Sequence, residues 1–221
     1  MFSHIPELKQ EEIDDSGAWL SIGDLMSALL MIFALLLISA LVQISEVAEE
    51  SQNNRIMIIK GINDALSAAN ISVSADPVTG DISILDSVLF EQNDYQLKDS
   101  GKTFLDTFIP IYSSVVFQSP ETAQEVVRIV LEGHSSMEGA FDHNMRLSVL
   151  RANSVSQYVN FQNFSNKDDF FQKLLVSGRG SLDADTSKVN ESDRKVMFRF
   201  QFKGLEFQKV IGQRELIDVN N

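Results

Sequence analysis

An acidic side chain, Asp24, lies inside a long apolar stretch of the sequence. The residues from Leu25 to Val42 read LMSALLMIFALLLISALV and carry no charge, and Asp24 is the one ionisable side chain in the wider range 18–44. Charged side chains are costly in hydrocarbon, so an acid in a membrane helix usually faces a partner helix or a water path and often carries protons. Asp24 is therefore a candidate ion carrier, whose carboxyl group would alternate between neutral and charged forms.

Asp24 also has a structural interpretation. It follows Gly23 and would serve as the N-cap of a helix that begins at Leu25, with its carboxylate at the level of the lipid headgroups. The neighbouring residues favour the ion-carrying role, because Gly23 and Ser27 are four residues apart and Ala28 adjoins them. Small side chains at this spacing let other helices approach closely.

A second set of polar side chains falls at helical spacing. Asn144, Ser148 and Arg151 are separated by four and three residues, so they lie on one face of a helix. The planar guanidinium of Arg151 suits a carboxylate ligand, and Asn144 supplies amide donors and an acceptor. The alternative is an internal ion pair between Arg151 and a nearby acid such as Glu138 or Asp142.

Composition excludes several classes of function. The net charge of -13 and the lack of any Lys/Arg cluster argue against a nucleic-acid partner. The chain has no cysteine, and its three histidines, His4, His134 and His143, lack the spacing of a zinc site. No glycine-rich phosphate loop or nucleophile elbow is present. We therefore expect a binding protein rather than an enzyme, with no catalytic centre, metal site or cofactor.

The apolar range 18–44 predicts a single transmembrane helix, because about 20 residues cross the roughly 30 Å hydrocarbon core. A cleaved signal peptide would have a shorter apolar region preceded by basic residues. Here the preceding residues are acidic, and Lys9 is their only basic side chain. Too few Lys and Arg residues flank the span to decide its orientation.

We expect five segments along the chain. They are an N-terminal segment over 1–17, the transmembrane helix over 18–44, a linker or stalk helix over 45–70, a globular domain over 71–203 and a C-terminal tail over 204–221. The stalk carries apolar residues at a spacing of three or four, namely Ile56, Ile59, Ile62, Leu66 and Ala69. This apolar face would either pack on the domain or form a dimer.

Within the domain, runs with strand-like and helix-like patterns alternate. Strands are predicted over 71–75, 81–85, 126–133, 174–178 and 195–203, and helices over 98–116, 141–161 and 167–174. Such alternation predicts an α/β domain, an α+β sandwich with helices on one face of a small sheet.

One motif of this domain resembles the peptidoglycan-binding motif of OmpA-like domains. The run Glu132-Gly-His-Ser-Ser-Met-Glu-Gly139 and the following Asn144-Met-Arg-Leu-Ser-Val-Leu-Arg-Ala-Asn153 are similar to that family's Gly-His-Thr-Asp and Asn-x-x-Leu-Ser-x-x-Arg-Ala. The resemblance extends over roughly residues 71–203 and implies an OmpA-like periplasmic fold. The peptidoglycan-binding residues that it implies are His143, Asn144, Leu147, Ser148 and Arg151, with Arg151 facing the carboxylate of diaminopimelate in the peptide stem.

One position departs from the family motif. The Asp that lies fifteen residues before the Arg is replaced by Ser136. In the family this carboxylate would meet the ammonium of diaminopimelate. Weaker binding, the use of Glu138 or Asp142 instead, and a different peptide stem all remain open.

The membrane segment carries a second resemblance. The run from Trp19 to Phe33 resembles the membrane helix of MotB-type stator proteins, and more closely that of the ZorB family of the Zorya anti-phage defence system. This implies that Asp24 carries the ion, for which we favour a proton, and that a homodimer of the chain lies inside a pentamer of a multi-pass ZorA/MotA-like subunit.

The same resemblance implies a location and a purpose. A peptidoglycan-bound domain lies in the periplasm, so the chain would cross the bacterial inner membrane once, with its N-terminus in the cytoplasm. The expected function is that of an ion-conducting, wall-anchored stator subunit in phage defence. The alternatives are a flagellar stator subunit and a passive wall tether of the OmpA or Pal kind.

Overall fold

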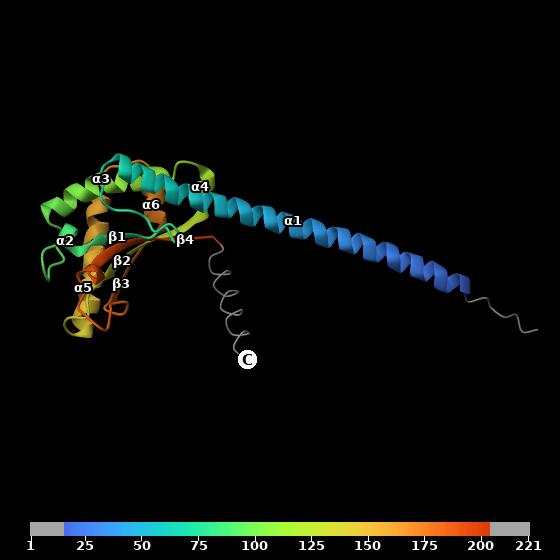
Figure 1. Cartoon of the computed structure of the whole chain (residues 1–221). Coiled ribbons are helices and arrows are strands. Elements are labelled where there is room, and N and C mark those ends of the chain that lie inside the picture. Colours follow the sequence, from blue (N-terminus) through green and yellow to red (C-terminus); the bar gives the residue numbers. More distant parts are fainter. Residues whose placement is uncertain (1–15, 204–221) are drawn as a thin grey trace, which may run out of the picture. The chain divides into compact units, whose positions relative to one another are not determined.

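The computed structural model describes residues 16–203 of the chain (Figure 1). They divide into two compact units, one ending at Glu49 and the other beginning at Glu50. The first 15 residues of the expected N-terminal segment, and the expected tail over 204–221, lie outside the described residues.

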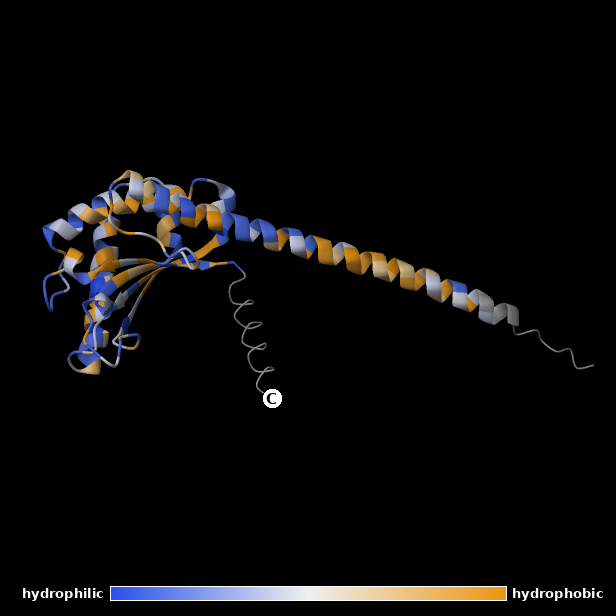
Figure 2. Ribbon diagram, in the orientation of Figure 1, coloured by the Kyte–Doolittle hydropathy of each residue, from blue (hydrophilic) through white to orange (hydrophobic). Residues whose placement is uncertain are grey.

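The longest element is the helix α1, Ser16–Ala68. Within the first unit its apolar side chains are exposed along the whole run, which Figure 2 shows as a continuous orange stretch. Among the described residues, it is the one helix long and apolar enough to cross a membrane. The structure thus contains the candidate membrane span that the sequence predicts.

The second unit is built on a four-stranded sheet with the order β1-β4-β2-β3. Its strands are β1 Ile82–Leu85, β2 Val126–His134, β3 Leu174–Gly180 and β4 Lys195–Phe202. The strand β4 lies between β1 and β2 and runs antiparallel to both, whereas β2 and β3 are parallel. The parallel pair requires a crossover, which α5 (Phe141–Phe161) and α6 (Lys167–Lys173) provide.

The helices cover one face of this sheet (Figure 1). Alternate residues of β4 are buried, and its inward side chains Val196, Phe198, Phe200 and Phe202 join the core cluster. This period of two is what a sheet covered on one face requires. The predicted sandwich of helices on one face of a small sheet is confirmed.

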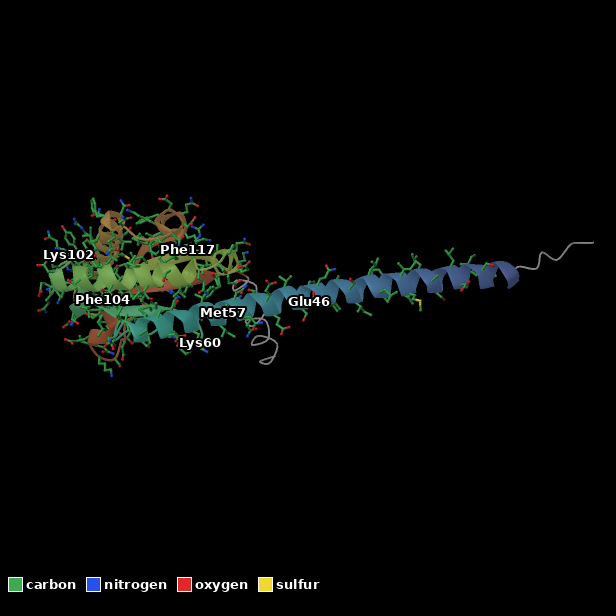
Figure 3. All side chains as sticks on the ribbon, turned by 90° about the horizontal axis from the view of Figure 1, so that it is seen from above. Glu46, Met57, Lys60, Lys102, Phe104 and Phe117 are labelled. Atoms are coloured by element: carbon green, nitrogen blue, oxygen red, sulfur yellow. The ribbon has the colours of Figure 1, made fainter. Side chains whose placement is uncertain are left out.

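The end of α1 belongs to this core. Ile58, Ile59, Ile62 and Leu66 are buried in it, and Gly61 lies against Val115 of α3, Asp99–Val116. Figure 3 shows this part of α1, marked by Met57 and Lys60, running beside α3, which carries Phe104. Ile59, Ile62 and Leu66 of the expected apolar face therefore pack on the domain, one of the two roles that its spacing allowed, whereas Ile56 of that face is exposed.

Polar contacts also attach α1 to the domain. Arg55 Nε lies 3.1 Å from Glu125 Oε1 and its Nη2 donates to the carbonyl of Lys203, while Ser51 Oγ donates to the same Glu125 oxygen. Glu125 ends α4, Pro120–Glu125, a short helix that the sequence analysis did not predict.

Residues 71–75 do not form the predicted strand. Only Ala75 makes a bridge to the sheet, to Ile82, and its backbone N–H and carbonyl bond instead to the side chain of Asn63. The Asn63 side chain thus satisfies backbone groups of Ala75 that a sheet ladder would otherwise use. The short helix α2, Asp86–Leu89, was also not predicted.

The helix α5 lies unusually close to the sheet. A Cβ atom at Gly133 of β2 would collide with the carbonyl oxygen of Ser148, and one at Gly178 of β3 would lie 2.6 Å from Ser148 Oγ. Ser148 Oγ also accepts a hydrogen bond from the backbone N–H of Gly180. The two glycines therefore set the depth at which α5 rests on β2 and β3.

We expect Gly133→Ala to destabilise the domain by about 1–3 kcal/mol, the usual cost of forcing extra volume into a packed core. Thermal unfolding of the full chain in detergent, followed by circular dichroism, measures the effect. Gly23→Ala is the matched control, because a Cβ at Gly23 meets nothing within 4 Å. An unchanged unfolding temperature in Gly133→Ala would show that α5 can shift outward at no cost.

Candidate functional site

A pocket of about 730 Å³ opens between the end of β1, the loop after β2, the start of α5 and the start of β4. Its walls carry charges of both signs. The acids are Asp86, Glu91, Glu138 and Glu191, and the cations are Lys98, Arg151 and Arg194. Such a lining suits a polar ligand that itself carries both charges.

Four of the five predicted peptidoglycan-binding residues line this pocket, namely His143, Asn144, Leu147 and Arg151. Ser148 lies outside the lining and is fully buried against the sheet. The helical spacing thus brings most of the predicted set together, while Ser148 contacts the sheet and holds the helix in place.

Arg151 lines the pocket and is only 2% exposed. Its Nη2 pairs with Asp86 Oδ2 at 2.8 Å, and its Nε donates to the carbonyl of Asp94 at 2.9 Å. The guanidinium also lies over the ring of Phe90, 5.4 Å from its centroid. The internal ion pair considered in the sequence analysis is therefore formed, with Asp86 rather than Glu138 or Asp142.

Burial governs the electrostatics of this pair. It raises the pKa of Asp86, and the nearby Arg151 guanidinium offsets that rise only in part. It also lowers the pKa of Arg151, although a guanidinium stays protonated in proteins. Each charge needs the other, since removing one partner of a buried pair typically costs about 3–5 kcal/mol.

Asn144 shapes the floor of the pocket. Its Nδ2 donates to the carbonyls of Ser136 and Glu138, at 3.1 and 2.8 Å, and so holds the loop after β2 against α5. Ser135 Oγ completes the connection by donating to the carbonyl of Asn144. The amide donors that the sequence analysis offered to a ligand are thus used to fix the loop.

The rim of the pocket is more exposed. Arg194 lies between Glu138 and Glu191, with 3.3 Å to a carboxylate oxygen of each. His143 is exposed and faces the same opening. Asp142, which the sequence analysis offered as a substitute acid, does not line the pocket.

Sequence reasoning missed Asp86, Phe90 and Arg194 as pocket residues. Asp86 directly follows β1 and Phe90 follows α2, and both lie more than 50 residues before Arg151; Arg194 precedes β4. No local spacing relates these residues to α5. The one available signal was that Asp86 directly follows the predicted strand over 81–85.

Asp24 lies in the other unit of the structure and is exposed on α1. The helix begins at Ser16, eight residues earlier, so Asp24 is inside it and cannot be its N-cap. The capping interpretation is therefore wrong. Gly23 precedes Asp24, and a Cβ atom added there would meet no other atom within 4 Å. Ser27 Oγ donates a hydrogen bond to the Gly23 carbonyl, so the side chains on this face of the helix stay close to the helix axis.

A second charged cluster lies on the face of the sheet opposite the helices. The side chains of Glu132, His134 and Asp183 approach closely enough to hold a metal ion, the one such group among the residues from 16 to 203. Cations of the chain already pair with both carboxylates, however, Arg199 with Glu132 and Arg179 with Asp183. The cluster is therefore an ion-pair network that joins β2, β4 and the loop after β3.

Comparison with known proteins relates both units to other chains. Residues 89–197 match the OmpA family. The Zorya protein ZorB of an Escherichia coli ETEC strain is 24% identical over 222 residues, covering 93% of this chain and 89% of that protein. ZorB of the Escherichia coli Crooks strain is 27% identical, covering 89% and 93%.

The fold also has a counterpart among solved structures. A MotB-like protein from Desulfovibrio vulgaris superposes with a TM-score of 0.50 and 18% identity, covering 71% of this chain and 96% of that one. Together with the family match, this shows that the second unit has an OmpA-like fold.

The ion-pair network predicts a dependence of stability on pH. The hydrogen bond with His134, helped by Arg199 and opposed by burial, lowers the pKa of Glu132 from 4.5 to about 2. A carboxylate with a lowered pKa stabilises the fold above its unfolded value and stops doing so as pH falls, here between about 4.5 and about 2. The lowered pKa of Glu132 contributes about 3 kcal/mol or less to the free energy of unfolding at neutral pH.

We therefore expect Glu132→Gln to lose about 2–3 kcal/mol at pH 7 and to show a shallower decline between pH 5 and 2 than the parent. Thermal unfolding of the full chain across this range measures both effects. Glu91→Gln is the control, because Glu91 is exposed and its nearest cation lies 3.9 Å away. Parallel pH profiles for the parent and Glu132→Gln would contradict the assignment.

Proposed function

We propose that this chain, which contains an OmpA-like domain and is similar to ZorB over most of its length, is the wall-anchored, ion-carrying subunit of an ion-driven membrane motor in phage defence. The observation that carries the proposal is the similarity to two ZorB proteins, which extends through both the candidate membrane span and the domain. A passive tether would require the domain but no acid inside the span.

The pocket supports the anchoring role. A stem peptide of peptidoglycan carries carboxylate and ammonium groups, and the pocket offers Arg151 and Lys98 to the first and acidic side chains to the second. His143 and Leu147 line the pocket and would flank the ligand. Asn144 and Ser148 would support binding indirectly, because Asn144 holds the loop after β2 and Ser148 holds α5 in place.

Asp24 supports the motor role. An acid exposed on a helix suited to a membrane needs a partner helix or a water path beside it, because a lone carboxylate in hydrocarbon is costly. One helix cannot enclose an ion path, so we infer a multi-pass partner. The resemblance to MotB-type stators implies that this partner is a ZorA/MotA-like subunit, present as a pentamer around a dimer of this chain. The ion is a proton, since a single carboxylate can carry one without a coordination shell.

The two roles together define the topology and the mechanism. A domain bound to peptidoglycan lies in the periplasm, which puts the N-terminus of this single-pass inner-membrane protein in the cytoplasm. Ions that cross by way of Asp24 would then move the surrounding partner, while the wall-bound domain holds this subunit still.

The ion-carrying role predicts that Asp24→Asn abolishes protection against phage, because it keeps the shape of the side chain and removes its titration. Plaque formation on cells that carry the complete defence system measures the effect, with the amount of the chain in the membrane checked by immunoblot. Glu46→Gln, an acid on the same helix beyond the apolar run (Figure 3), should leave protection intact. Full protection in Asp24→Asn would refute the role.

The anchoring role predicts that Arg151→Lys weakens binding to peptidoglycan, because an ammonium cannot reproduce the planar fork of a guanidinium. Co-sedimentation of the detergent-solubilised full chain with purified sacculi measures binding. Arg146→Lys is the matched control on the same helix, as Arg146 is exposed and does not line the pocket. Equal sedimentation of all three proteins would overturn the assignment of Arg151.

A further inference from the structure

A second pocket, of about 420 Å³, lies between the end of α3 and the starts of α4 and α6. A cavity of this volume is large enough for a small organic ligand. Its charged side chains are one acid, Asp169, and one cation, Lys173. The second pocket therefore has no net formal charge, unlike the first pocket, whose walls carry several charges of each sign.

The second pocket is remote from the first. It is lined by Ala123 and Gln124, which precede β2, and by Asn166, which follows α5. The first pocket is lined instead by residues that follow β2 and by the start of α5. Figure 1 shows α4 and α6 far from the start of α5. Because the 21 residues of α5 rise about 1.5 Å each, the two pockets are about 30 Å apart, and one small ligand cannot fill both.

The polar side chains of the second pocket have unused hydrogen-bonding groups. Gln118, Gln124, Asn166 and Asp169 are exposed, and their side chains form no hydrogen bond or ion pair with any residue from 16 to 203. A side-chain amide offers two donors and an acceptor oxygen. These side chains can therefore bind a ligand whose own polar groups both donate and accept.

The rest of the lining favours a neutral ligand. Lys173 Nζ donates to the carbonyl of Val126 at 2.6 Å, which holds this cation at the pocket wall. Phe117, Pro120 and Ala123 add apolar surface. A sugar ring combines apolar C–H faces with hydroxyl groups that donate and accept hydrogen bonds. It is therefore complementary to a lining of amides and apolar side chains.

We propose that the second pocket binds a neutral sugar of the glycan strand of peptidoglycan, with the amide side chains bonded to its hydroxyl groups. This inference rests on the proposed binding of peptidoglycan and adds a separate contact with the same polymer. A contact made by exposed, neutral side chains is weak on its own. It strengthens binding once the first pocket holds a stem peptide of the same strand, because the second contact is then intramolecular.

The length of the glycan separates the two contacts. A single disaccharide that carries its stem peptide can fill only the first pocket, whereas a long soluble strand with stem peptides can reach both. Isothermal titration calorimetry of the full chain in detergent measures the affinity for each ligand. We expect the parent to bind the long strand about tenfold more tightly or better, the gain that a linked second contact supplies.

Variants then identify the pocket. Gln118→Ala/Gln124→Ala removes two amides from the second pocket, so it should lower the affinity for the long strand about tenfold and leave the affinity for the disaccharide unchanged. Gln157→Ala/Gln172→Ala is the matched control, because both glutamines are exposed and line neither pocket. It should change neither affinity. Comparing variants on the same strand removes the effect of its several stem peptides.

Each outcome decides between distinct claims. A parent chain that binds neither ligand contradicts the proposed function itself. If the parent binds both and Gln118→Ala/Gln124→Ala matches it on the long strand, the present inference is overturned and wall anchoring stands. A variant that loses affinity for both ligands equally acts on the first pocket or on the fold, and this result also overturns the inference.

Discussion

The burial of the Arg151 charge is the constraint on which the arrangement of the pocket depends. Arg151 is the largest fully buried side chain of the described chain, and a guanidinium in that position must be neutralised and hydrogen-bonded. Asp86 and the Asp94 carbonyl meet this need from a segment more than 50 residues away in sequence. The pair thereby holds the end of β1 against α5, and the space between them becomes the pocket.

The depth of α5 on the sheet makes this pairing possible. Gly133 and Gly178 let the helix lie close to β2 and β3, and Ser148 bonds to the backbone there. Asn144, one turn earlier, fixes the loop that forms the pocket floor. One face of α5 therefore both attaches the helix to the sheet and lines the pocket, which explains why only some of its polar residues remain available to a ligand.

Periodicity could predict the elements, and it could not predict their partners. The apolar run, the alternation of β4 and the three-to-four spacing of α5 predicted the candidate membrane span, the sheet and the grouping of Asn144 with Arg151, because each depends on neighbours in sequence. The pairing of Asp86 with Arg151 and the contacts of Asn63 with Ala75 are tertiary contacts between residues far apart in sequence. The start of α1 ahead of Asp24 is not marked by an acidic residue in the first turn of the helix. None of these leaves a local pattern.

The proposed function requires that the pocket bind the peptide stem of peptidoglycan, since a motor subunit without an anchor would move with its partner. Isothermal titration calorimetry of the full chain with a soluble glycan fragment that carries its stem peptide tests this most directly. We expect saturable binding of one fragment per chain, and no binding of the same glycan without its peptide. Equal binding of the peptide-free glycan, or no binding of either, would contradict it.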